Sequence, residues 1–146
     1  MNAKEAEALA KSMAAECIAV RVRRLSRVVS SIYDREFKEL GIKGNQATML
    51  VALSFPDVKS PSAVGRTLKM EKSTVSRNLD RMRVKGWIEI IDSGEGIQHT
   101  VRMTQSGLDL LERVHVKWKI AQKKASELLG SDGLASIMLL ASKSRK

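Results

Sequence analysis

Residues 60–104 read SPSAVGRTLKMEKSTVSRNLDRMRVKGWIEIIDSGEGIQHTVRMT, and this stretch decides the fold. It opens with a strong signal for the start of a helix. Ser60 can accept hydrogen bonds from free backbone amides, and Pro61 suits the first helical position, where an N–H is not needed. The apolar face of this first helix is formed by Ala63, Val64 and Leu68.

A second helix is predicted from about residue 72 to residue 85. Its apolar face has helical spacing and consists of Val75, Leu79, Met82 and Val84. Its other face carries Ser73, Thr74, Ser76, Arg77, Asn78 and Arg81. Short polar side chains followed by arginines suit a helix in the major groove of DNA, where arginine reaches guanine edges. Residues 66–85 include seven basic and two acidic residues, an excess that favours a phosphate backbone as partner.

A β-hairpin is predicted after the second helix. Gly86 is interpreted as the helix stop, and residues 87–91 form the first strand with Trp87, Ile88, Ile90 and Ile91. Residues 92–96, DSGEG, have the composition of a hairpin tip, and residues 97–103 form the second strand.

Helix, turn, helix and hairpin in this order indicate a winged helix-turn-helix. The segments LGIKGNQATML, SAVGRTLKMEKSTVSRNLDRMRVKGWIE and VRMTQSGLDLL resemble the MarR family of bacterial transcriptional regulators, over about residues 17–140. The resemblance implies a homodimer held together by its N- and C-terminal helices. It also implies a sequence-specific regulator, a repressor that responds to a small-molecule effector and binds a pseudo-palindromic operator.

The residues expected to contact double-stranded DNA come from both helices and the hairpin. They are Ser60, Lys72, Ser73, Thr74, Ser76, Arg77, Arg81, Gln98 and His99. A competing interpretation is that residues 74–81 are only the solvated face of an amphipathic surface helix.

Two positions depart from the pattern of the resembled family. Many members carry an arginine near the hairpin tip that enters the minor groove, whereas Glu95, Gly96 and Ile97 occupy the corresponding positions here. Gln98 and His99 could replace it as backbone contacts. Ala47 stands where the family often has an aromatic residue, so a ligand cavity beside it would have a different shape.

The sequence divides into three regions of one intertwined domain. Residues 1–40 are predicted to form an N-terminal dimerisation helix, with exposed arginines at 21, 23, 24 and 27. Residues 41–104 form the winged helix-turn-helix, beginning at Gly41 as a left-handed helix cap and Asn45 as the cap of a short helix. Residues 105–146 form C-terminal dimerisation helices, capped by Thr104 and interrupted at Gly130. The predicted fold class is therefore mainly α with a small β-hairpin.

Composition narrows the classes of function. The chain has 146 residues and a formal net charge of +10, which suits nucleic acid but also suits an acidic membrane surface or simple solubility. Aromatic residues make up 3%, too few for a protein that stacks single-stranded bases. No apolar run is long enough to cross a membrane, and the expected location is the cytoplasm. The alternative to a sequence-specific regulator is an architectural protein that coats DNA with little sequence preference.

No catalytic chemistry is predicted. His99 and His115 lie on different elements, and neither has a carboxylate or cysteine at catalytic spacing. No cofactor or metal site is expected. Cys17 is the single cysteine, and its position is near that of a reactive thiol in a peroxide-sensing branch of the family. The tyrosines expected around such a thiol are absent, so Cys17 is interpreted as a small apolar side chain, with redox sensing as the alternative.

Overall fold

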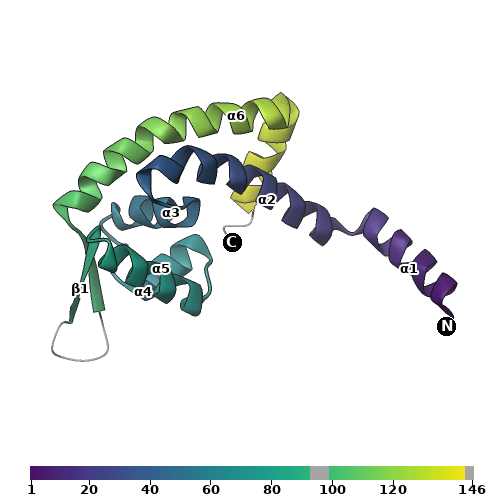
Figure 1. The fold of residues 1–146 in the computed structure, drawn as a ribbon, viewed down its shortest axis with the longest axis horizontal. Helices are drawn as coiled ribbons and strands as arrows, with labels where there is room; N and C mark the ends of the chain where they lie inside the picture. The colour runs from purple at the N-terminus through teal and green to yellow at the C-terminus, as the bar shows by residue number, and fades with distance from the viewer. Residues whose placement is uncertain (93–98, 144–146) are drawn as a thin grey trace.

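The computed structural model describes residues 1–92 and 99–143 and has the predicted class, mainly helical with one small hairpin (Figure 1). The hairpin is a two-stranded antiparallel sheet. The elements in chain order are α1 (Ala3–Glu16), α2 (Ile18–Phe37), the short 3-10 helix η1 (Lys38–Leu40), α3 (Gly44–Leu53), α4 (Pro61–Leu68), α5 (Lys72–Val84), β1 (Ile88–Asp92), β2 (His99–Met103) and α6 (Gln105–Lys143).

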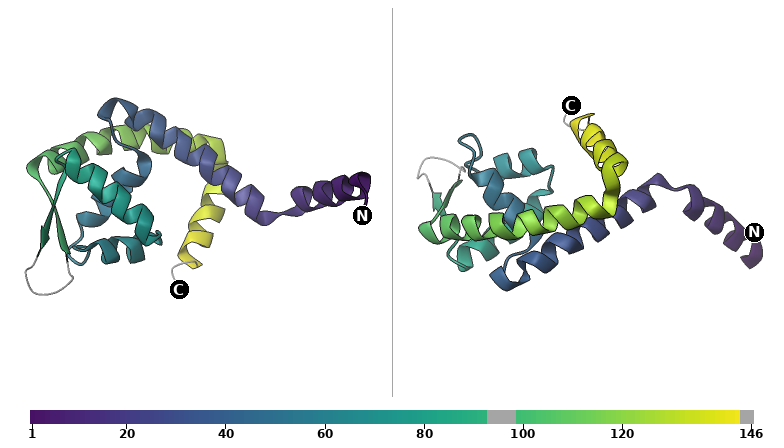
Figure 2. Two further views of the ribbon diagram at one scale, coloured as in Figure 1. Left: turned by 60° about the horizontal axis from the view of Figure 1, so that its bottom comes forward. Right: turned by 90° about the horizontal axis from the view of Figure 1, so that it is seen from above.

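The helices form a compact end and an extended end. α6 packs along α2, and α3, α4, α5 and the hairpin gather beside this pair at one end of the molecule (Figures 1 and 2). At the other end, α1 projects away from the body, and none of its residues is buried. The core is therefore confined to the compact end, where three short helices and the hairpin meet.

The core of the compact end contains the apolar stripe predicted for α5. Val75, Leu79 and Met82 are buried, together with Met49, Leu50 and Leu53 of α3. The side chains of Val64, Ile88 and Val101 complete it from α4 and the hairpin. The prediction for Val84 was wrong, because its side chain is 81% exposed. It lies at the last position of α5, two residues beyond Met82, where a helix has turned its side chains away from the buried face.

The connection between α4 and α5 is tight, as the sequence predicted. The hydroxyl of Ser60 accepts a hydrogen bond from the Ala63 amide at 3.2 Å, which confirms Ser60 as the cap of α4. α4 ends at Lys69, which has a left-handed φ of 51°, and the amide of Met70 donates to the Gly65 carbonyl at 2.9 Å. This turn sets α5 across α4.

The hairpin packs against the compact end and is hydrogen-bonded to it. Ile88 pairs with Met103 and Ile90 with Val101 in the antiparallel register. The amide of Val101 also donates to the carbonyl of Lys59 at 2.8 Å, which ties the hairpin to the segment before α4. The predicted tip and the start of the predicted second strand, residues 93–98, lie outside the described residues.

Two sequence-based boundaries were wrong at the N-terminal side. The predicted helix over residues 3–40 is broken at Cys17, whose ψ of 109° is extended, although neither glycine nor proline marks the break. Asn45 does not cap the short helix, which begins at Gly44. The carboxylate of Asp34 in α2 accepts from the Gly44 amide at 2.7 Å, and the side chain of Gln46 accepts from the Lys43 amide at 3.2 Å, so a tertiary and a local contact together satisfy the start of the helix.

Two glycines interrupt helices where the sequence placed them. Gly41 has a φ of 68° and ends η1 in the left-handed conformation. Gly130 has a φ of 66° and a ψ of 174°, which divides α6 into a long helix and a C-terminal one. Glycine adopts both conformations without the steric cost that a side chain adds.

Thr104 joins the hairpin to α6. Its hydroxyl accepts from the Gly107 amide at 3.1 Å and donates to the carbonyl of Gly86 at 2.6 Å, and its own amide donates to the carbonyl of Trp87 at 3.1 Å. Gly107 lies directly against the backbone of Trp87, since a Cβ atom at Gly107 would come within 2.1 Å of the Trp87 oxygen. The sequence pattern TQSG therefore encodes both a helix cap and a close backbone approach.

We expect Gly107→Ala to destabilise the fold by about 1 to 3 kcal/mol, because the added methyl group forces the start of α6 away from Trp87. Chemical denaturation measures this change. Gly133→Ala is the matched control, since the nearest atom to its new Cβ, in the side chain of Leu129, is at 3.4 Å. That variant should be neutral or more stable by up to about 1 kcal/mol. Equal unfolding free energies for the two variants would contradict the close approach.

Candidate nucleic-acid interface and adjoining cavity

α5 presents most of its predicted polar face to solvent. The side chains of Lys72, Ser73, Ser76, Arg77 and Arg81 are exposed, and that of Thr74 is half-buried. The buried stripe holds the opposite face in the core, so these groups are displayed on a helix that cannot rotate freely. One predicted member of this face differs, because Asn78 is only 6% exposed and lies among the core residues.

Arg77 lies along its own helix. Its Nε donates to the carbonyl of Ser73 one turn earlier, at 3.2 Å. This contact keeps the guanidinium beside the first turn of α5, where the small hydroxyl side chains are. A guanidinium held in this way retains terminal N–H groups for a base edge or a phosphate.

The remaining predicted contacts come from α4 and the hairpin. Ser60 caps α4, and its hydroxyl also lies 3.1 Å from that of Ser62. His99 is exposed on β2 and lines a shallow depression together with Ser76 and Arg83 of α5, so the hairpin and α5 do converge. Gln98 lies outside the described residues, as do Glu95, Gly96 and Ile97, which replace the family's hairpin arginine.

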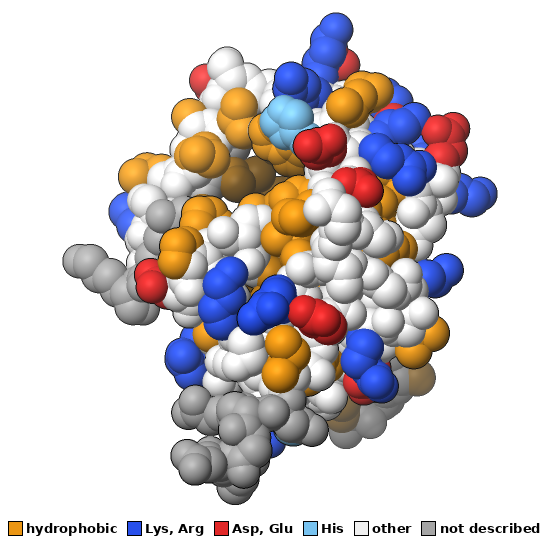
Figure 3. All heavy atoms as spheres, turned by 90° about the vertical axis from the view of Figure 1, so that its left-hand side faces the viewer, with side chains coloured by type: hydrophobic (Ala, Val, Ile, Leu, Met, Phe, Trp, Pro, Cys, Tyr) orange, Lys and Arg blue, Asp and Glu red, His pale blue; other side chains and the backbone are white. Residues whose placement is uncertain are grey.

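A cavity of about 1140 Å³ lies between α2, α3 and α6. Its walls are largely aromatic and apolar, and the aromatic side chains are Tyr33, Phe37, Phe55, His115 and Trp118. In the space-filling view of one face of the molecule, apolar side chains are exposed in a band between basic and acidic ones (Figure 3). Ala47, beside which the family resemblance implied a cavity, also lines it.

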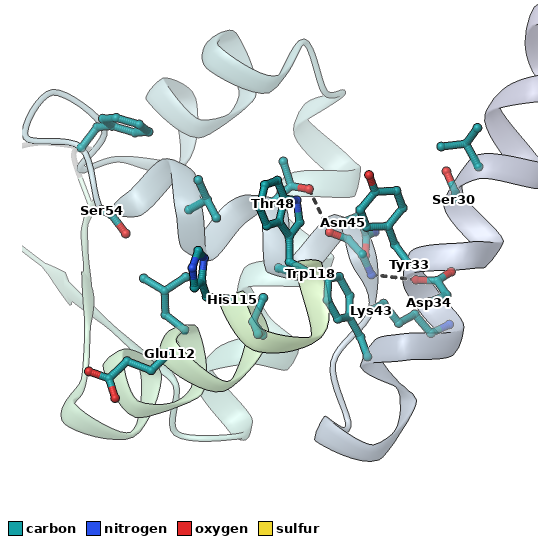
Figure 4. A pocket seen from close by; sticks show the side chains of 18 residues that line it. Ser30, Tyr33, Asp34, Lys43, Asn45, Thr48, Ser54, Glu112, His115 and Trp118 are labelled. Atoms are coloured by element: carbon teal, nitrogen blue, oxygen red, sulfur yellow. Dashed lines mark hydrogen bonds between the residues drawn. The ribbon is translucent and has the colours of Figure 1, made fainter. Parts of the chain in front are cut away.

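Polar groups enter the cavity from three helices. Figure 4 shows Tyr33 and Asp34 projecting from α2 toward the first turn of α3, where Asn45 and Thr48 lie, with Trp118 contributed by α6. The ring of Trp118 stacks on that of His115, with centroids 5.9 Å apart and planes inclined by 15°. The arrangement suits a small flat molecule with a few polar groups.

Hydrogen bonds and ion pairs fix the helices around this cavity. Tyr33 donates its hydroxyl to Oε1 of Gln122 at 2.5 Å, and burial raises the pKa of this phenol. Near the end of α2, Lys117 donates to the carboxylate of Glu39 at 2.7 Å. That hydrogen bond, and then the opposite charge of the partner, lower the pKa of Glu39 and raise that of Lys117. Because Glu39 is exposed and Lys117 is only half-buried, this pair orients the helices more than it stabilises them.

The resemblance implied a ligand cavity beside Ala47, but the local sequence patterns did not show it, and they were misread for Asn78, which is buried. The cavity is formed by helices far apart in the sequence, so no local sequence pattern predicts it. Asn78, in contrast, follows Val75 by three residues and precedes Met82 by four, which is the spacing of the buried stripe. Its amide side chain had suggested the polar face, whereas the periodicity alone placed it in the core.

Other sequence predictions concerned residues outside this region. Cys17 is half-exposed at the junction between α1 and α2, and the arginines at 21, 23, 24 and 27 are exposed as predicted. Within residues 1–92 and 99–143, no cluster of three or more histidine, cysteine or acidic side chains could hold a metal ion. Among the described helices, none is both long and apolar enough to span a membrane.

Comparisons with known proteins support the fold. Residues 40–96 match the model of the MarR family, which covers the segment from η1 to the hairpin. A search of curated proteins found no match.

Solved structures resemble the chain over most of its length. A mutant MarR from E. coli complexed with operator DNA superimposes with a TM-score of 0.78 at 18% identity, covering 92% of this chain and 97% of that one. BpsR from Bordetella bronchiseptica, whose DNA binding is regulated by 6-hydroxynicotinic acid, gives 0.77 at 17% identity, covering 88% and 93%. The transcriptional regulator MosR from M. tuberculosis gives 0.74 at 22% identity, covering 88% and 96%. Residues 40–96 of the chain match the model of the MarR family, and the structure as a whole has the winged helix fold of these solved proteins.

Proposed function

We propose that the protein is a transcriptional regulator that binds double-stranded DNA sequence-specifically as a homodimer. The observation that carries this proposal is that α5 exposes its polar face while its apolar face is buried. Its apolar side is fixed in the core, and its other side presents hydroxyl groups and arginines to solvent in a segment with a large excess of positive charge. A helix held in this way can enter the major groove, where the exposed side chains reach base edges and phosphates.

The solved relatives support this proposal. The mutant MarR with a similar fold was crystallised with operator DNA, which shows that this winged helix fold can bind an operator. We infer that α5 is the recognition helix of the present protein and that the hairpin follows the neighbouring backbone. The protein would act in the cytoplasm, where bacterial DNA is accessible to it.

Repression controlled by a small molecule is the regulatory mode that we propose. The aromatic cavity adjoins α3, which packs on α5, so an occupant can influence the DNA-binding end. BpsR provides a precedent for regulation of DNA binding by a small aromatic acid in this fold. A repressor of this kind releases its operator when the cavity is filled.

Competition for DNA tests the function and separates it from the architectural alternative. DNA sites are selected from a random pool with the purified protein, and the selected site is then challenged with a large excess of unrelated DNA. A specific regulator retains its site under these conditions. Equal displacement by any DNA would identify a protein that coats DNA with little sequence preference, and no binding at moderate salt would exclude both functions.

The homodimer explains the apolar surface of the extended end. Met13 and Ile18 are 64% and 76% exposed near the α1 and α2 junction, and Met138 and Leu140 are 66% and 63% exposed in the C-terminal part of α6. Exposed apolar surface on two helical segments at one end of a chain is typical of an interface. Two-fold symmetry would then place two copies of α5 in successive major grooves about 34 Å apart.

We expect sedimentation at micromolar concentration to show a species of twice the 16.2 kDa chain mass. The double variant Ile18→Lys, Met138→Lys should sediment as a monomer, because two charges cannot be buried in an apolar interface without partners. Val84→Lys also replaces an exposed apolar side chain, but at the end of α5, and should remain dimeric. A wild-type protein found only at 16.2 kDa would contradict the proposed assembly.

Arg77 is expected to read a base. Arg77→Ala should then weaken binding to the selected site by about 1 to 3 kcal/mol and flatten the preference at one position of each half-site. Lys119→Ala is the control, since it removes one exposed charge from α6. Uniform weakening on all sequences, with a salt slope reduced by about one per subunit, would show instead that Arg77 clamps a phosphate. Unchanged affinity would remove it from the interface.

Cys17 is expected to have no redox role. Cys17→Ser should leave DNA affinity unchanged, because the residue lies at the junction of α1 and α2, far along the chain from the display of α5. Micromolar peroxide should not release the wild-type protein from its site, as measured by fluorescence anisotropy of labelled DNA. Release of the wild type but not of the serine variant would establish redox sensing.

A further inference from the structure

Asn78 is a buried polar side chain within the proposed recognition helix. Its Nδ2 donates to the carbonyl of Thr74 one turn earlier at 2.8 Å. Its Oδ1 accepts from Nδ2 of Asn45, in α3, at 3.4 Å. Among the described residues no buried side-chain nitrogen or oxygen atom lacks a partner, and for the Asn78 oxygen the bond from Asn45 is the side-chain contact that meets this need. A buried amide oxygen left without a donor is unfavourable.

Asn45 contacts Asn78 of α5 and also lines the aromatic cavity. Its side chain is exposed at the first turn of α3, where it lines the aromatic cavity (Figure 4). The same turn is attached to α2 through Asp34, whose carboxylate accepts from the Gly44 amide at 2.7 Å. Asp34 also lines the cavity. A continuous series of hydrogen bonds therefore runs from α2, through the first turn of α3, to Asn78 and the Thr74 carbonyl in α5.

The end of this series lies at the DNA-facing part of α5. Thr74 is half-buried in the first turn, between the exposed Ser73 and the core residue Val75. Ser73 in turn accepts the hydrogen bond that holds Arg77 along the helix. The bond from Asn45 is long, so it is weak and can be given up when Asn45 finds a better acceptor.

We propose that Asn45 is a positioning residue for DNA recognition, which fixes the orientation of α5 from the wall of the cavity through the buried amide of Asn78. The hydrogen bond from Asn45 to Asn78 thus connects the cavity wall directly to the proposed recognition helix. This inference deepens the proposed function and rests on it for its biological meaning, whereas the mechanical link can be measured without DNA.

Hydrogen exchange in the DNA-free protein tests the mechanical link. In Asn45→Ala, the backbone amides of the first two turns of α5 should exchange about threefold or more faster than in the wild type, since the net loss of one hydrogen bond is of that order. Thr48→Val is the matched control. Thr48 lines the same cavity from the same helix, but its hydroxyl donates only within α3, to the Gly44 carbonyl at 2.9 Å. Unchanged exchange of α5 in Asn45→Ala, or an equal change in Thr48→Val, would overturn the proposal.

The variant Asn45→Asp distinguishes an effect on the position of α5 from a general loss of stability. The variant has nearly the same shape, but it places a carboxylate oxygen against Oδ1 of Asn78 in place of a donor. An acidic side chain in the first turn of α3 is also favourable for that helix and offsets part of the lost hydrogen bond, so the melting temperature should fall less than in Asn45→Ala. Preference for the selected site over unrelated DNA should nevertheless fall at least as much as in Asn45→Ala. A loss of affinity equal on both DNAs would indicate charge repulsion and would overturn positioning.

A double-mutant cycle with Asn78→Ala measures whether the two residues act together. The loss of site preference in the double variant should be clearly smaller than the sum of the two single losses, because each single change breaks the same bond. Additive losses would overturn the link. If the wild-type protein binds no DNA, the proposed function fails, and the hydrogen-exchange comparison still decides the inference.

Discussion

The fold depends on the burial of one face of α5. Val75, Leu79 and Met82 lie in a core formed with α3, α4 and the hairpin, and each of these three side chains is almost completely inaccessible to solvent. Burying three such side chains contributes several kcal/mol, on the order of 1.5 to 3 kcal/mol each. Because a helix has only one way to present that stripe, the same burial determines which polar side chains face outward. Stability and the exposure of the proposed DNA-binding groups are therefore consequences of a single packing arrangement.

A second constraint connects this core to α6. The Thr104 cap and the close approach of Gly107 to the Trp87 backbone leave little freedom between the hairpin and the long helix. α6 then packs along α2, with Val114, Ala121 and Ala125 buried. The small side chains of the two alanines bring the helices close together. The Tyr33 and Gln122 hydrogen bond and the partly exposed ion pairs fix the helices' relative rotation, while the apolar contacts supply most of the stability.

The cavity lies where these two constraints meet. It is bounded by α2 and α6 on one side and by α3 on the other, so its volume depends on how the helix pair sits over the compact end. Asp34 and Asn45 lie at this boundary. The carboxylate of Asp34 accepts a hydrogen bond from the first residue of α3, and the amide of Asn45 donates one to Asn78 in α5. The side chains that would meet a ligand are thus also structural contacts, which provides a physical route from occupancy of the cavity to the orientation of α5.

Local sequence determined most of the helix-turn-helix and the hairpin, since capping residues, helical periodicity and glycine positions act over a few residues. Ser60, Thr104, Gly41 and Gly130 have the roles that their chemistry predicts, and the stripe of α5 is buried as its spacing requires. The breaks and contacts that depend on distant partners could not be predicted in this way. The Gly44 amide at the start of α3 donates to Asp34 of another helix, the break at Cys17 has no local marker, and the hydrogen bond from Asn45 to Asn78 joins residues 33 apart in the chain. The cavity likewise exists only after α2, α3 and α6 have packed, because its walls are side chains whose proximity is decided by tertiary structure.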